Sequence, residues 1–417
     1  MPKINPEVEA FARIKVVGVG GSGRNAVNHM VRSKVNGVEF IVANTDAQDL
    51  HNSLASKKIH IGKNLTRGLG TGMNPELGRR AAEETKEEIQ EALKGADMVF
   101  IASGMGGGTG TGASPIVAKT ARELNALTIG VVTKPFFFEG SQRMLLAENG
   151  LDALEAEVDA LIIIPNDKLL NTAKDTTILA AFAQCDEVLR QAVEGISDLI
   201  TTPGLINVDF ADIKAIMANA GTALMGIGVA SGENRATEAA RMSINSPLLD
   251  VSINGARGVL FAIAGSEDMT MNEIQEAAKI ITESVDVNAK VIFGAIIDPK
   301  LRKGEIKITV IATGFPEAGR VAMKKPEMVK RNTVPEVAGE DAEDEDDGAL
   351  FSKHDEKFSD AVRKDKDAVE RAIFHTAPEE KTHTVNLHRE EQVKVEEDDE
   401  DDDLGVIPSF LRRSKLR

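Results

Sequence analysis

The chain has 417 residues, enough for two or three domains, and its formal net charge of −17 argues against general nucleic-acid binding. A single cysteine, Cys185, excludes intramolecular disulfides and cysteine-rich metal sites, and we expect it to be a buried apolar residue. The sequence contains neither a signal-peptide pattern nor an apolar run long enough to span a bilayer. We therefore expect a soluble, cytoplasmic protein.

Strand and helix patterns alternate along the first half of the chain. The expected strands are residues 14–18, 38–43, 98–102, 127–133 and 160–164. The expected helices between them are residues 25–35, 75–93 and 113–126. This alternation predicts an α/β fold with a doubly wound parallel sheet, whose ligands gather at the carboxyl ends of the strands.

The second half of the chain has a different order of expected helices and strands. A long helical pattern at 177–200 predicts a central helix between two domains. Beyond it, the expected elements are strands at 258–264, 291–297 and 306–313 and a helix at 271–285. We therefore predict a sheet domain at 1–176, a central connecting helix at 177–202 and a smaller α+β domain at 203–316.

The remaining residues form a tail of two parts. Acidic runs at 340–347 and 396–403 cannot bury enough apolar surface to fold, so 317–403 is expected to be a disordered acidic linker. Apolar residues at 351–374 recur at roughly heptad spacing, so a short helix in this interval is left as an alternative. Residues 404–417 become apolar and basic, with Pro408 suited to a helix's first turn, which predicts a partner-docking peptide.

Two glycine-rich runs each lie between an expected strand and an expected helix. The first, Gly18-Val-Gly-Gly-Ser-Gly23, matches the dinucleotide pattern, with Asp46 following the next strand, so a nicotinamide-dependent oxidoreductase is one interpretation. The second, at 104–112, reads Gly-Met-Gly-Gly-Gly-Thr-Gly-Thr-Gly and is typical of an anion-binding loop, because glycine lets backbone N–H groups approach phosphate.

Two loops suit a nucleoside triphosphate better than a dinucleotide, which needs only one. The second run lacks the lysine of a P-loop, so phosphate would be held by neutral donors while a divalent cation carries the positive charge. A third glycine-rich turn at 68–72 is suited to closing over the outer phosphate. Farther along, Asn207-Val-Asp209-Phe-Ala-Asp212 supplies carboxylates that can orient water or simply begin a helix.

These motifs together resemble the tubulin/FtsZ family of GTPases. Residues 106–112 match its signature loop, and residues 207–212 and 407–412 match two further motifs, with similarity extending over about 14–316 and again over 404–413. The resemblance implies a GTPase with GTP or GDP and Mg²⁺ as cofactors, which assembles head-to-tail into protofilaments and forms the division ring at midcell. A non-catalytic nucleotide-binding scaffold is the third class that the loops alone leave open.

The resemblance also assigns site residues in the sheet domain, which becomes the GTP-binding domain. The first loop contributes Gly20, Gly21, Ser22, Gly23, Arg24 and Asn25, and the signature loop contributes Gly107, Gly108, Thr109 and Gly110. Thr133, Glu139 and Arg143 match positions beside the ribose and phosphates, and Asn166, Phe182 and Asp186 match the guanine pocket. Ser22 and Arg24 depart from the family pattern. Arg24 can either add charge near a phosphate or point outward.

Catalysis and partner binding are further implications of the resemblance. The loop with Asn207, Asp209 and Asp212 would enter the neighbouring subunit's nucleotide site, so that hydrolysis depends on polymerisation. The end peptide, through Ile407, Pro408, Phe410, Leu411 and Arg412, would dock on a membrane tether such as FtsA and on other division regulators. Neither nucleic acid nor direct membrane insertion is expected.

Overall fold

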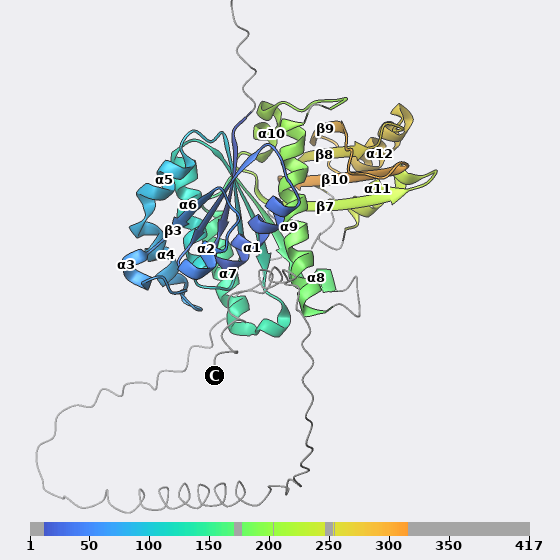
Figure 1. Cartoon of the computed structure of the whole chain (residues 1–417). Coiled ribbons are helices and arrows are strands. Elements are labelled where there is room, and N and C mark those ends of the chain that lie inside the picture. Colours follow the sequence, from blue (N-terminus) through green and yellow to red (C-terminus); the bar gives the residue numbers. More distant parts are fainter. Residues whose placement is uncertain (1–11, 171–176, 203, 247–252, 254, 316–417) are drawn as a thin grey trace, which may run out of the picture. The chain divides into compact units, whose positions relative to one another are not determined.

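The computed structural model describes residues 12–170, 177–202, 204–246, 253 and 255–315, and its central feature is a ten-stranded sheet (Figure 1). Its strands follow the order β3-β2-β1-β4-β5-β6-β7-β10-β8-β9. Their bounds are β1 (Ile14–Val19), β2 (Val38–Asn44), β3 (Lys57–His60), β4 (Met98–Gly104), β5 (Leu127–Lys134), β6 (Ala160–Pro165), β7 (Gly221–Ser231), β8 (Gly258–Gly265), β9 (Lys290–Ile297) and β10 (Glu305–Thr313). From β3 to β7 every neighbouring pair is parallel, which confirms the predicted α/β class.

The parallel strands are buried on both faces because helices cover both sides of the sheet. Val16 and Phe100 face one apolar cluster, which includes Met30 of α1, whereas their chain neighbours face a second cluster. Alternate burial on two faces explains why these strands read as continuous apolar runs in the sequence. β1 and β4 are adjacent, with Gly18 aligned to Ala102, so the loops that follow them leave the same edge of the sheet.

Helices connect the strands along the whole described chain. Their bounds are α1 (Gly20–Arg32), α2 (Ala47–His51), α3 (Lys63–Thr66), α4 (Pro75–Glu84), α5 (Lys86–Leu93), α6 (Thr109–Glu123), α7 (Ser141–Glu155), α8 (Asn166–Leu170), α9 (Ile178–Thr201), α10 (Phe210–Met217), α11 (Arg235–Ile244) and α12 (Met271–Glu283), with a 3-10 turn η1 at Phe137–Glu139. The single helix expected at 75–93 is interrupted at Thr85, whose hydroxyl accepts from Gly62 N and donates to Ala81 O. The glycine run at 20–23 is itself helical, so α1 begins earlier than expected.

The predicted central helix is confirmed as α9, which begins after Thr177, whose hydroxyl accepts a hydrogen bond from Ala180 N. Beyond α9, β10 pairs antiparallel with β7 and β8, and β9 runs parallel to β8 at the edge of the sheet. A third apolar cluster packs α11 and α12 against these strands. Figure 1 shows α9 running between the two groups of strands.

The tail predictions for 317–403 and 404–417, including the open helix at 351–374, lie outside the described residues. Within the described part of the chain, the helices are too short or too polar to cross a bilayer. Cys185 is buried as expected, and this burial raises the pKa of its thiol well above the usual value.

Candidate functional site

The cavity that most of the expected site residues line, called the main cavity below, has a volume of about 380 Å³ and lies where the loops after β1 and β4 meet. α1 and α6 both begin at this cavity, and neither has a capping side chain or an acidic residue in its first turn. Their first N–H groups and positive dipole ends are therefore available to an anion. Gly20 adopts φ 72°, and an added Cβ would lie 2.9 Å from Gly110 N, so only glycine allows the loops this contact.

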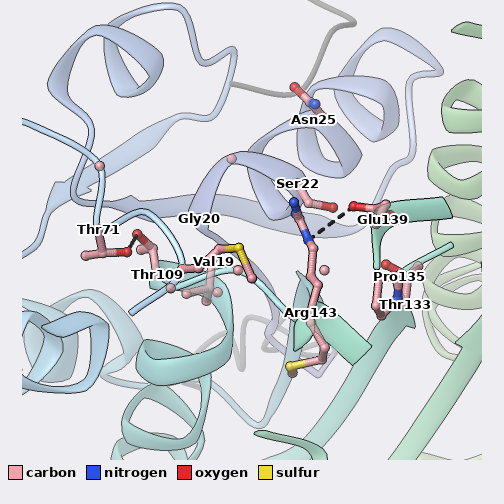
Figure 2. A pocket seen from close by; sticks show the side chains of 18 of the residues that line it. Val19, Gly20, Ser22, Asn25, Thr71, Thr109, Thr133, Pro135, Glu139 and Arg143 are labelled. Carbon is pink, nitrogen blue, oxygen red and sulfur yellow. Dashed lines mark hydrogen bonds and ion pairs between the residues drawn. The ribbon is translucent and has the colours of Figure 1, made fainter. Parts of the chain in front are cut away.

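The third glycine-rich turn lies against the signature loop, as Figure 2 shows for Thr71 and Thr109. The hydroxyl oxygens of these two residues are 2.9 Å apart, and Gly108 N donates to Gly72 O over 2.8 Å. Gly70, Thr71, Gly72 and Met73 all line the cavity. The turn at 68–72 therefore forms part of the cavity wall beside the signature loop.

A second wall is formed by the end of β5 and the segment that leads into α7. Thr133 and Pro135 line the cavity, and Arg143 Nε lies 3.1 Å from Glu139 Oε2 (Figure 2). Glu139 Oε1 also accepts from Phe136 N over 2.9 Å. The carboxylate of Glu139 is therefore held in place by both the backbone and a cation, with both side chains largely buried.

The first turns of α9 and the start of α8 close the remaining side, where Asn166, Phe182, Cys185 and Asp186 line the cavity. Burial raises the pKa of Asp186 to about 7, although the positive charges of His29 and Arg24 oppose this effect. Asn25 Oδ1 and Asn166 Oδ1 are buried and have no hydrogen-bond partner among the described residues. Acceptors without a partner in a cavity wall suit a ligand that donates hydrogen bonds.

Most of the cofactor-binding residues expected from the sequence line this cavity, and two do not. Gly23 packs against Ala102 in the floor, and Arg24 is buried in an ion pair with Asp49, so neither lies at the cavity surface. Arg24 neither lines the cavity nor points outward, because its guanidinium is directed at the buried carboxylate of Asp49. Ser22 is not in the left-handed region, so its side chain causes no backbone strain in this loop.

The carboxylate loop lies away from the cavity. Asp209 begins α10, where its Oδ1 accepts from Ala211 N, and Asp212 is exposed in the first turn. Asn207 Oδ1 accepts from Gly204 N over 2.7 Å, and a bridge between Ile206 and Ala295 joins the loop to β9. None of the three candidate catalytic residues lines the cavity of its own chain.

Sequence reasoning missed several residues of the cavity wall. Asn44, Pro135 and Cys185 line it but were not assigned to the site. Asn44 ends β2 and Pro135 directly follows β5, and this position at the carboxyl edge of the sheet is the signal that could have identified these two residues.

Two family models and several solved structures match this chain. The family described as the GTPase domain of the Tubulin/FtsZ family matches residues 13–174, and the C-terminal domain of the FtsZ family matches residues 221–316. An empty FtsZ dimer from M. jannaschii is 44% identical with a TM-score of 0.72, covering 79% of this chain and 96% of its own. A point mutant of M. jannaschii FtsZ is 47% identical with a TM-score of 0.71, covering 73% and 92%.

A more distant structure shares the fold alone. CetZ2 from Haloferax volcanii, solved as a GTPγS-bound protofilament, is 18% identical with a TM-score of 0.61, covering 86% of this chain and 99% of its own. The fold and the two family matches define the class of protein as a GTPase of the tubulin type. The chain belongs to the FtsZ family. The nicotinamide interpretation of Gly18–Gly23 is thereby set aside.

Proposed function

We propose that this GTPase binds GTP in the main cavity, polymerises head-to-tail into protofilaments and hydrolyses the nucleotide at the junction between subunits. The observation that carries the proposal is the separation of the cavity from the carboxylate loop. Asp186 lies at the cavity in α9, and the fifteen residues from there to Thr201 rise about 22 Å along the helix axis. Asp209 and Asp212 follow beyond that far end, where Figure 1 shows α10.

The phosphates are assigned to the N-termini of α1 and α6. Gly20, Gly21, Gly107, Gly108 and Gly110 offer close backbone approach, and the Thr109 hydroxyl adds a neutral donor. Thr133, Glu139 and Arg143 are assigned to the ribose and the phosphates nearest to it. This arrangement needs no P-loop lysine, because backbone donors and helix dipoles supply the positive field.

The base is assigned to the opposite side of the cavity. An ionised Asp186 accepts from guanine N1–H and N2–H, whereas adenine offers no such pair of donors. Phe182 packs on the ring, and the Asn166 Oδ1 that lacks a protein partner is available to the base or ribose. Selectivity for guanine then rests chiefly on Asp186.

Magnesium fits this site as an ion held mainly by the nucleotide. No group of three His, Cys, Asp or Glu side chains in the described ranges could hold a metal. Mg²⁺ usually takes phosphate oxygens and waters with only one or two carboxylates, and Asp46 lies beside Gly70 on the phosphate side. Bound there, the ion would neutralise charge on the phosphates.

Hydrolysis requires groups that orient and polarise water, and carboxylates perform this role. We assign it to Asp209 and Asp212 of an adjacent subunit, with Asn207 holding the turn that presents them. The bridge to β9 holds the loop in one conformation, so the loop can enter a neighbour's cavity without rearranging. Monomers would then bind GTP without rapid turnover.

Exposed apolar side chains lie at both ends of the proposed junction. Met73 lines the cavity, Leu69, Phe137 and Phe138 are exposed on the two segments that line it, and exposed Leu205 precedes the carboxylate loop. A contact between unlike ends does not close on itself and therefore builds filaments. The M. jannaschii relative solved as a dimer supports self-association.

In the cell we propose that such filaments form the division ring in the cytoplasm at midcell. The end peptide, with Ile407, Pro408, Phe410, Leu411 and Arg412, would bind a membrane tether such as FtsA and other division regulators. The linker 317–403 would act as a charged, extended spacer.

The direct test is GTP hydrolysis measured against protein concentration, with sedimentation alongside. Cooperative onset of turnover at the concentration where polymer first pellets supports the proposal. Turnover at constant specific rate in dilute, unpolymerised protein contradicts it.

A further inference from the structure

A continuous network of buried polar groups connects Arg24 with the signature loop. Arg24 and Asp49 are 1% and 2% exposed and form an ion pair. Asp49 Oδ2 accepts from Asn44 Nδ2 over 2.8 Å, and Asn44 Oδ1 accepts from Thr45 N over 2.8 Å. The network therefore passes from α1 through α2 to the end of β2.

Three threonine hydroxyls continue the network to the cavity. Thr45 Oγ1 lies 2.9 Å from Thr109 Oγ1, which in turn lies 2.9 Å from Thr71 Oγ1. Thr109 and Thr71 line the cavity, whereas Thr45 is fully buried behind them. The hydroxyl of Thr45 therefore reaches the proposed phosphate site through Thr109.

The ion pair determines how the amide of Asn44 is oriented. An ionised carboxylate only accepts hydrogen bonds, so Nδ2 of Asn44 must face Asp49 and Oδ1 must face the backbone of Thr45. Removing Arg24 would leave Asp49 buried without its cationic partner, a costly state that favours rearrangement around it. The conformation of Thr45 thus depends on Arg24, although the side chains of Asp49 and Asn44 lie between the two residues.

We propose that Arg24 and Asp49 are positioning residues for GTP binding, which hold Thr45 against Thr109 by fixing Asn44. With Thr45 and Thr71 both donating to the Thr109 oxygen, the single Thr109 hydrogen is directed toward a phosphate oxygen. The inference rests on the proposed role of Thr109 as a phosphate ligand. It gives Arg24, which does not line the cavity, an indirect role that acts through Asp49, Asn44 and Thr45.

The first test uses Thr45→Val, which keeps the shape of a buried side chain and removes only its hydroxyl. We expect full-length Thr45→Val to bind GTP about fivefold more weakly, as for loss of one net hydrogen bond, with its affinity for guanosine unchanged. Guanosine lacks phosphates, so a general loss of structure would weaken both ligands alike. Thr45→Ser should restore GTP affinity.

The second test addresses Arg24 itself. Arg24→Met should weaken GTP binding at least as much as Thr45→Val, and Arg24→Lys should recover part of the loss because it keeps the charge. Arg235→Met is the matched control, since Arg235 is also buried and paired with Glu273 and Asp268, but in the α+β part of the chain. It should lower the melting temperature and leave GTP affinity of the folded protein unchanged.

The outcomes separate this inference from the proposed site. Full GTP affinity in Thr45→Val or Arg24→Met, with reduced affinity in Thr109→Val, would overturn the positioning role alone. Full affinity in Thr109→Val would instead overturn the assignment of Thr109 as a phosphate ligand. If Arg24→Met does not fold, Thr45→Val and its serine rescue still decide the question.

Discussion

Phe138 stacks on Phe136, with ring centroids 5.0 Å apart and an interplanar angle of 12°. Phe136 is fully buried and also meets Phe182 edge-on at 5.4 Å, so an exposed ring is anchored to the wall of the nucleotide cavity. The same short turn directs Glu139 into the cavity. A protein contact on the exposed side of this turn would therefore act on the same short segment that holds Glu139, which is assigned to the nucleotide.

The first prediction concerns the neighbouring ring of Phe137, which is 85% exposed and has no role in the core. Phe137→Ser should raise the critical concentration for polymerisation about tenfold or more, as expected for loss of an aromatic anchor at an interface. GTP affinity of the monomer should not change. Sedimentation across a concentration series measures the effect.

Met242→Ser is the control for this substitution, because Met242 is also an exposed apolar residue but lies on α11, away from both proposed junction surfaces. It should polymerise as the wild type does. A Phe137→Ser protein with an unchanged critical concentration would remove this turn from the interface.

The second prediction tests catalysis between subunits by mixing two inactive variants. Asp212→Ala keeps an intact cavity, and Asp186→Ala keeps an intact carboxylate loop but loses its assigned contacts with guanine. Each alone should hydrolyse GTP at least a hundredfold more slowly than the wild type. Their mixture should regain activity, because the loop of one can serve the nucleotide of the other.

A mixture that stays as inactive as its components would mean that the carboxylates do not act on a neighbour's nucleotide. Asp152→Ala, which removes an exposed carboxylate on α7, controls for the general loss of a negative charge and should remain active.

The third prediction follows from the raised pKa of Asp186, which is about 7 because the carboxyl group is buried. Below that pH the group is protonated and loses its capacity to accept two hydrogen bonds from guanine. GTP affinity should therefore fall about tenfold between pH 8 and pH 6, and binding at pH 7 should release protons. Calorimetry in buffers of different ionisation enthalpy measures both quantities.

Asp186→Asn should bind weakly at every pH and abolish this pH dependence, since an amide does not titrate. If the variant retains the wild-type slope, another group is responsible for it.

Much of the fold could be predicted because its signals are local. β1, β2, β4, β5 and β6 are largely buried, so each is a visible apolar run, whereas β3, at the edge of the sheet with only Ile59 buried, was not expected. β7 was missed because Gly221, Gly226 and Gly228 weaken its strand pattern. At Gly228 an added Cβ would collide with Ala239 O, so this glycine serves the close packing of α11 on the sheet, a tertiary requirement that the local sequence does not reveal.

The parts of the site that could be predicted are the loops that contain glycine-rich runs. The direction of the Arg24 side chain was not, because its partner Asp49 lies twenty-five residues away and on another helix. The pairing of Thr71 with Thr109 likewise joins two loops that only the folded sheet brings together. In both cases polar partners are chosen by tertiary geometry, which a single sequence specifies only indirectly.

The fourth prediction concerns the end peptide. Deleting 404–417 should leave GTPase activity and sedimentation unchanged, because these residues are outside the proposed junction. It should abolish recruitment of filaments to membranes that carry a tether such as FtsA. Loss of polymerisation itself would contradict the assignment of this segment as a docking peptide.

In the proposed filament, α9 would give each subunit a nucleotide at one end and a hydrolytic loop at the other, so the two tips would be chemically unequal. At one tip the last cavity would face solvent without an incoming loop, and its GTP would persist and exchange. At the other tip the last loop would project with no substrate to act on. A growing filament would thus carry an uncleaved triphosphate at a single terminus, and this asymmetry by itself gives assembly a kinetic direction.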